Sequence, residues 1–129
     1  MTEKLLRILY VEDEPDIQMV AKLSLESIGG FIVKACSSGD EAIQSAVEFE
    51  PQLILLDVMM PGMDGPTTLK RLREIPQIAT IPVIFMTAKV QPEEIKQYKN
   101  LGAINVIAKP FDPMTLTAEI EESWEHYND

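Results

Sequence analysis

Cysteine and histidine are almost absent from this sequence of 129 residues, which has one of each, Cys36 and His126. A single cysteine cannot form an intramolecular disulfide, and a single histidine cannot build a histidine-rich metal site. This scarcity argues against a disulfide-stapled secreted domain and favours a reducing compartment, so we expect the protein to be cytoplasmic.

Long hydrophobic runs and excess positive charge are missing as well. No run approaches the roughly 20 apolar residues that a membrane-spanning helix needs, and Met1–Arg7 lacks the apolar core of a secretory signal, so we expect no membrane association. The chain carries 21 Asp and Glu against 11 Lys and Arg, a formal net charge of −10. Phosphate backbones repel such a chain, so we expect no direct binding to nucleic acid.

The sequence does contain a regular alternation of apolar runs and amphipathic stretches. With 46% apolar residues, its length suits a single domain over residues 1–129. Two of the runs, Leu53–Leu56 and Val83–Met86, have no polar alternation, which is typical of strands buried on both faces of a parallel sheet. The predicted strands are Leu5–Val11, Phe31–Cys36, Leu53–Leu56, Ile81–Met86 and Ala103–Ala108.

Helical periodicity fills the segments that follow these strands. Pro15 suits the first turn of the first helix, and Ser38 and Glu41 have the spacing of a capping box before the second. Trp124 and Tyr98 lie in apolar stripes, which predicts that both face the core. The stripes are Ile17, Val20, Ala21, Ser24 and Ile28; Ala42, Ile43, Ala46 and Val47; Leu69, Leu72 and Ile75; Ile95, Tyr98 and Leu101; and Leu116, Ile120, Trp124 and Tyr127.

Five strand–helix units in this length predict a doubly wound α/β domain, with a five-stranded parallel sheet covered by five helices. The flavodoxin-like strand order, 2-1-3-4-5, is common for such a sheet. Ligands then bind beyond the carboxyl ends of the strands, at the switch point between the first and third strands.

Polar side chains follow four of the five predicted strands. Glu12 and Asp13 follow the first, Asp57 the third, Thr87 the fourth and Lys109 the fifth. At one edge of a sheet their carboxylates would repel one another unless a cation neutralised them, and Mg²⁺ suits a site of carboxylate and phosphate oxygens. Asp57 could then attack a phosphoryl group, while Lys109 and the Thr87 hydroxyl offset charge on the transferring oxygens.

Each of these residues also has an ordinary structural explanation. Asp13 could cap the helix whose first turn holds Pro15, Thr87 could be a loop or cap residue, and Lys109 could be a solvated surface lysine. Asp57 is harder to explain in this way, since it ends a strand that is buried on both faces. The joint placement at the strand ends favours one phosphoryl site.

Four segments form a recognisable family pattern: Leu9–Glu14, Leu55–Gly65, Met86–Ala88 and Lys109–Phe111. With these segments the chain resembles the receiver domains of bacterial response regulators, the chemotaxis-type module of two-component systems. The segment around Asp57 is highly specific, and the resemblance covers essentially the whole length.

The resemblance implies that Asp57 accepts a phosphoryl group from the phosphohistidine of a sensor histidine kinase or a histidine phosphotransfer protein. It also implies that Asp13, Asp57 and the backbone carbonyl of Met59 ligate Mg²⁺, with Glu12 acting through a metal-bound water. The domain would then be no enzyme in the usual sense, because it would catalyse only its own phosphorylation and dephosphorylation.

A conformational switch is implied as well. Thr87 would move toward the phosphoryl group, and Lys109, on a cis peptide bond to the following proline, would bind one of its oxygens. The family usually has Tyr or Phe three residues before the lysine, where this chain has Val106. We therefore expect the loop Thr87–Gln91 to carry the signal to a protein target on the face made by the Pro92–Leu101 helix, the fifth strand and the last helix.

Three other functions fit parts of the pattern. A hydrolase of the haloacid dehalogenase type needs a second aspartate two residues after the first, where Met59 stands. A flavin binder should have hydroxyls and glycines in its first loop, whereas Glu12-Asp13-Glu14 would repel the flavin phosphate. A pseudo-receiver, which only binds partners, would not need the phosphoryl-site residues, all of which are present.

Overall fold

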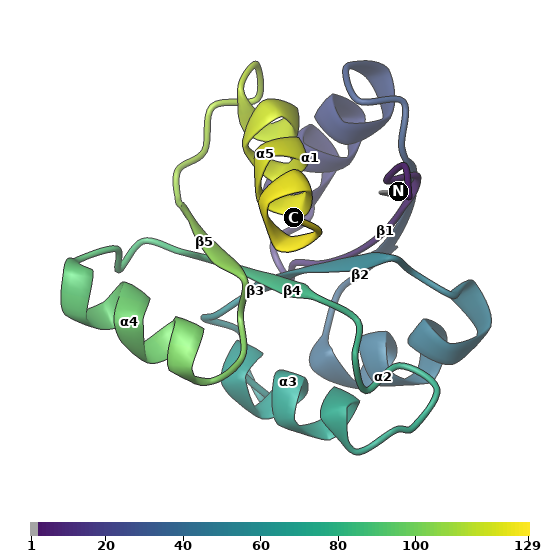
Figure 1. Ribbon diagram of the computed structural model, residues 1–129, viewed down its shortest axis with the longest axis vertical. Coiled ribbons are helices and arrows are strands. Elements are labelled where there is room, and N and C mark those ends of the chain that lie inside the picture. The colour runs from purple at the N-terminus through teal and green to yellow at the C-terminus, as the bar shows by residue number, and fades with distance from the viewer. Residues whose placement is uncertain (1–2) are drawn as a thin grey trace.

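The computed structural model describes residues 3–129, in which a five-stranded sheet lies between two layers of helices (Figure 1). The strands are β1 (Arg7–Val11), β2 (Ile32–Cys36), β3 (Leu53–Asp57), β4 (Val83–Thr87) and β5 (Asn105–Ala108). The helices are α1 (Pro15–Ser27), α2 (Gly39–Phe49), α3 (Gly65–Arg73), α4 (Pro92–Asn100) and α5 (Leu116–Tyr127). All neighbouring strands are parallel and their order is β2-β1-β3-β4-β5, which confirms the predicted fold.

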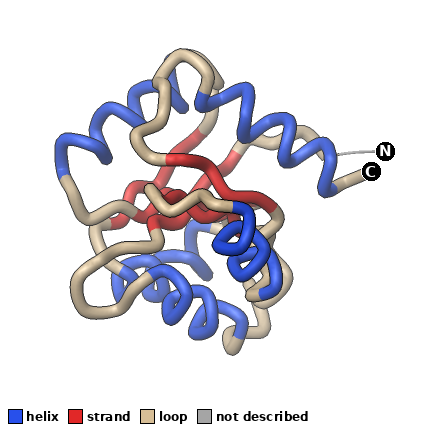
Figure 2. Tube along the Cα trace, turned by 90° about the vertical axis from the view of Figure 1, so that its left-hand side faces the viewer, coloured by secondary structure: helices blue, strands red, loops and turns tan. Residues whose placement is uncertain are grey.

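The sheet divides the apolar core into two parts. Helices α1 and α5 cover one face of the sheet, and α2, α3 and α4 cover the other (Figure 1). Figure 2 shows the strands, in red, enclosed between helices on both sides. β3 and β4 are buried along their whole length, whereas the edge strand β2 is buried only at Cys36. Burial on both faces explains why β3 and β4 have no polar alternation.

Helix α1 matches its predicted apolar stripe only in part. Its buried residues are Ala21, Ser24 and Leu25, whereas Val20 and Ile28 are exposed, so the expectation for these two is wrong. α1 packs beside α5 on this face of the sheet, and the Ser24 hydroxyl donates to the Pro113 carbonyl. Three further residues of the predicted stripes are exposed, namely Val47, Leu101 and Tyr127.

The predicted capping box at the start of α2 forms only in part. The Ser38 hydroxyl accepts a hydrogen bond from Glu41 N at 3.1 Å, as expected. The Glu41 carboxylate, however, accepts from Ser37 N at 2.8 Å instead of from the N–H of the capping residue. It therefore satisfies the first backbone N–H beyond the end of β2.

The aromatic residues Trp124 and Tyr98 both face the core, as predicted. Trp124 is buried in α5, and its Nε1 donates to the Glu3 carbonyl at 2.9 Å. Tyr98 is half-buried and packs edge-on against Phe85, with ring centroids 5.4 Å apart. Over Pro92–Asn100, α4 contains no fully buried residue, so partly buried side chains such as Tyr98 attach it to the sheet. Within residues 3–129, none of the helices has the length and apolar character needed to cross a membrane.

Candidate functional site

The structure brings the predicted site residues to one edge of the sheet. Glu12 and Asp13 directly follow β1, Asp57 ends β3, Thr87 ends β4 and Lys109 directly follows β5. Because β1 and β3 are neighbours and β4 and β5 come next, these carboxyl ends surround the switch point of the sheet. The side chains come from segments nearly 100 residues apart in the chain, so the fold alone assembles them.

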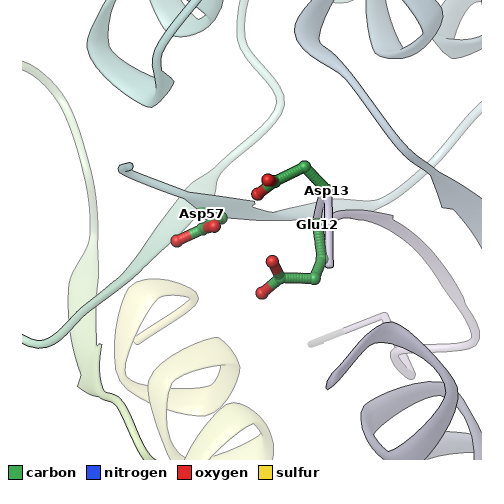
Figure 3. Close-up of side chains that lie close together, drawn as sticks. All are labelled: Glu12, Asp13 and Asp57. Atoms are coloured by element: carbon green, nitrogen blue, oxygen red, sulfur yellow. The ribbon is translucent and has the colours of Figure 1, made fainter. Parts of the chain in front are cut away.

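Three carboxylates form the centre of the site (Figure 3). One oxygen from each of Glu12, Asp13 and Asp57 lies within 4.8 Å of the others. Glu12 is fully buried, Asp57 is 2% exposed, and Asp13 is half-buried. Figure 3 shows all three labelled side chains grouped beyond the strand ends. Such a group is electrostatically costly, because like charges repel strongly where water is excluded.

Lys109 partly neutralises this group. Its ammonium lies 2.9 Å from a carboxylate oxygen of Glu12 and 3.2 Å from one of Asp57. Its side chain is only 17% exposed, so these ion pairs are shielded from solvent, and the interpretation of Lys109 as a solvated surface lysine is wrong. The peptide bond to Pro110 is cis, as the family resemblance implies. Lys109 pairs with two of the three carboxylates, and within residues 3–129 Asp13 forms no such ion pair.

The acidic loop after β1 is stabilised by a hydrogen bond within the loop and by contacts from α1. Glu14 N donates to the Glu12 carboxylate at 3.1 Å. Gln18 Nε2 donates to the Glu12 carbonyl at 2.8 Å and to the Cys36 carbonyl at 3.1 Å. The N-cap residue of α1 is Glu14, so the alternative interpretation of Asp13 as the cap is wrong. The Asp13 carboxylate instead lies with those of the other two acids (Figure 3).

Thr87 and the segment after Asp57 complete the site. The Thr87 side chain is buried, and its hydroxyl accepts a hydrogen bond from Lys89 N at 3.1 Å. Met59 lies two residues beyond Asp57 with an exposed side chain. Gly65, at the start of α3, lies directly against the end of β3, since a Cβ there would be 2.6 Å from the Asp57 carbonyl oxygen. Only glycine allows this approach, so α3 begins in contact with the Asp57 backbone.

The comparison with known families agrees with this geometry. A family model described as the response regulator receiver domain matches residues 8–121. The chain belongs to the response regulator receiver domain family. It is thus the receiver domain of a two-component response regulator, a signalling module of a kind that interacts with histidine kinases.

Relatives of this receiver domain include longer regulators. The probable C4-dicarboxylate response regulator DctR of Halalkalibacterium halodurans is 35% identical over 121 residues, which cover 93% of this chain and 52% of DctR. The DNA-binding dual master transcriptional regulator RpaA of Synechocystis is 36% identical over 114 residues, 88% of this chain and 47% of RpaA. The chain therefore spans about half the length of the curated relatives it matches.

Two solved structures share the receiver fold over nearly the whole length of this chain. The chemotaxis protein CheY4 of Vibrio cholerae superposes with a TM-score of 0.85 at 28% identity, covering 93% of this chain and 99% of CheY4. A response regulator from Desulfuromonas acetoxidans gives a TM-score of 0.82 at 31% identity, covering 94% of this chain and 98% of that one. Both matches confirm the predicted flavodoxin-like receiver fold.

The electrostatics of the receiver site fit a hard divalent cation. Burial and, after it, the charge of Glu12 raise the pKa of Asp57 to about 7, although Lys109 acts in the opposite direction. Burial lowers the pKa of Lys109, but hydrogen bonds and charge from Glu12 and Asp57 outweigh it and raise that pKa overall. The receiver site is thus short of positive charge, and its oxygen ligands are those that Mg²⁺ takes in proteins.

The raised pKa predicts how stability depends on pH without a metal. A carboxyl group whose pKa is raised by folding contributes stability below its unfolded pKa, and this is lost as pH rises through the folded pKa. For Asp57 the loss falls between its ordinary value of 3.8 and about 7. In EDTA, the free energy of unfolding of wild type should therefore fall by about 2–3 kcal/mol between pH 5 and pH 8, relative to that of Asp57→Asn. Denaturant melts of both proteins at the two pH values measure this, and a constant difference between them would show that Asp57 does not titrate there.

Two contacts of the receiver site were not predicted from the sequence. The Gln18 side chain donates to carbonyls at the ends of β1 and β2, and Lys89 N donates to the Thr87 hydroxyl. The sequence shows only that Gln18 is a polar residue one helical turn after Glu14, and such a residue is equally typical of a solvent-exposed position. No pattern indicated the bond to Lys89, because it depends on the turn that the chain makes after β4.

Proposed function

We propose that residues 1–129 form a single receiver domain that accepts a phosphoryl group on Asp57 from the phosphohistidine of a histidine kinase or a histidine phosphotransfer protein. The observation that supports this most directly is the buried Asp57 carboxylate at the switch point, with two further acids and Lys109 around it. A carboxylate oxygen of Asp57 attacks phosphorus, the P–N bond to histidine breaks, and the imidazole leaves with the bonding electrons. Incubation with acetyl phosphate and Mg²⁺ followed by intact-mass measurement tests it, and one added phosphoryl group is expected.

Mg²⁺ would be held by Asp13, Asp57 and the backbone carbonyl of Met59, with Glu12 acting through a bound water. When bound, the cation supplies positive charge that allows an anionic phosphoryl group to approach the carboxylates. Lys109 would then exchange its contact with Asp57 for one with a phosphoryl oxygen. The domain would turn over no external substrate and would act in the cytoplasm.

The signal would leave the site through Thr87. In the structure its hydroxyl holds Lys89 N, so drawing the hydroxyl toward a phosphoryl group would displace the loop that leads into α4. Val106 lies beside Phe85 in the β4–β5 ladder, and its short branched side chain cannot swing as an aromatic ring does. We therefore place the downstream protein target on the α4–β5–α5 face and the switch in the Thr87–Gln91 loop.

Thr87→Ala should uncouple this loop from the acceptor, whereas Thr87→Ser, which retains a hydroxyl, should not. With Mg²⁺ and beryllofluoride, wild type and Thr87→Ser should show amide shifts along α4, and Thr87→Ala should lose most of them. Allosteric coupling is typically ~1–3 kcal/mol, so phosphorylation should raise the affinity of wild type for its target about 5–150-fold. Thr87→Ala should lose most of this gain. The route is wrong if Thr87→Ala retains the shifts while Val106→Ala abolishes them.

A further inference from the structure

The side chain of Gln18 joins the ends of two strands at the metal-binding edge. Its single amide nitrogen donates to the Glu12 carbonyl at 2.8 Å and to the Cys36 carbonyl at 3.1 Å, with a weaker approach of 3.4 Å to the Ser37 hydroxyl. An NH₂ group has two hydrogens, so it can serve two carbonyls at once. Cys36 O also accepts from Glu12 N at 3.0 Å, so the two strand ends and α1 meet at this point.

These bonds fix the backbone on both sides of Asp13. Because the peptide group is planar, holding the Glu12 carbonyl also sets the orientation of the Asp13 N–Cα bond. On the other side, Glu14 N bonds to the Glu12 carboxylate, and Gln18 N donates to the Glu14 carbonyl at 2.9 Å. Gln18 thus contacts both neighbours of Asp13, one through its side chain and one through its backbone.

We propose that Gln18 is a positioning residue for Asp13, and that its amide keeps the Asp13 carboxylate directed at the metal site before any cation binds. The inference rests on the proposed metal-dependent function and assigns a role to a residue outside the carboxylate cluster. A ligand group that is already ordered loses less conformational entropy when it binds, so the benefit is metal affinity. The alternative is that the two bonds only stabilise the fold, as any buried side chain-to-backbone bond does.

Ser24 offers a matched control for that alternative. It also lies on α1, and its hydroxyl also donates to a backbone carbonyl, that of Pro113, but on the α5 side of the domain. Gln18→Met keeps the length of the side chain and removes its donors, and Ser24→Ala removes the other bond. Both variants should lose stability, and only the first should affect Asp13.

The experiment compares Mg²⁺ binding and amide exchange in the 129-residue chain. Titration calorimetry with MgCl₂ should give a Kd about three- to tenfold higher for Gln18→Met than for wild type, as expected for a lost hydrogen bond. Ser24→Ala should stay within about twofold of wild type. In metal-free protein the Glu12 and Glu14 amides, which donate to the Cys36 carbonyl and to the Glu12 carboxylate, should exchange faster in Gln18→Met and at the wild-type rate in Ser24→Ala.

The outcomes separate this inference from the proposed function. If wild type binds Mg²⁺ and Gln18→Met binds it equally well, Gln18 has no positioning role and the metal site stands. Unchanged exchange of the Glu12 and Glu14 amides in Gln18→Met overturns the inference by itself, whatever the cation does. If wild type fails to bind Mg²⁺, the proposed metal-dependent function is overturned instead.

Discussion

Asp57→Asn should abolish phosphorylation completely and leave the fold intact. Asparagine has the same shape as aspartate but lacks the charged oxygen that attacks phosphorus. The Asp57 side chain is buried, and the Asp57 backbone is fixed by the close approach of Gly65, so the exchange of one oxygen for an amide group should not disturb the fold. Wild type and variant are incubated with acetyl phosphate and Mg²⁺ and weighed intact, and only wild type should gain mass.

Two controls make this result specific to Asp57. Asp40→Asn changes an exposed acid in the first turn of α2 and should be labelled like wild type. Denaturant melts should show that Asp57→Asn is at least as stable as wild type in EDTA, since it removes a buried charge. A phosphorylated Asp57→Asn protein would falsify the assignment and direct attention to Glu12 and Asp13.

Removing the divalent cation should have the second-largest effect. Three carboxylates within 4.8 Å would otherwise repel the incoming phosphoryl group. EDTA should therefore eliminate labelling of wild type, and Asp13→Ala should slow labelling by about two orders of magnitude, as expected for several kcal/mol of lost charge stabilisation. The measurement is the rate of mass gain with acetyl phosphate at several Mg²⁺ concentrations.

The control for this prediction lies three residues along the chain. Asp16 is exposed in the first turn of α1, so Asp16→Ala should be labelled at close to the wild-type rate. Higher Mg²⁺ should partly restore Asp13→Ala, because Asp57 remains as a ligand. Unchanged labelling of wild type in EDTA would contradict the metal requirement.

β3 and β4 were predictable because burial on both faces leaves a run without polar alternation, and the strand order followed from the one that is common for five-stranded sheets of this class. Leu53–Leu56 and Val83–Met86 contain no polar residue, and both lie in fully buried strands. Once five parallel strands are placed in the flavodoxin-like order, the positions after them must converge. The cluster of Glu12, Asp13 and Asp57 was therefore predictable from chain position alone.

The faces of the helices and the support of the site were less predictable. Val20 continues the apolar stripe of α1 but is exposed, whereas Leu25, which lies outside that stripe, is buried. Gln18 shows the same limit, since the acceptors of its amide lie on two strand ends whose positions depend on the whole fold. Metal ligation, the role of the Met59 carbonyl and the phosphodonor stay predictions.

α3 and α4 differ in how closely they pack against the sheet, and this difference affects the rate and the free energy of a rearrangement of α4. α3 starts against the Asp57 backbone at Gly65, whereas α4 buries no residue completely over Pro92–Asn100. Segments with so little buried apolar surface open locally at low free energy, and such rearrangements take place in microseconds to milliseconds. α4 should therefore visit a second arrangement in the unmodified protein, and the proposed phosphorylation of Asp57 would need only to change the relative populations of the two arrangements.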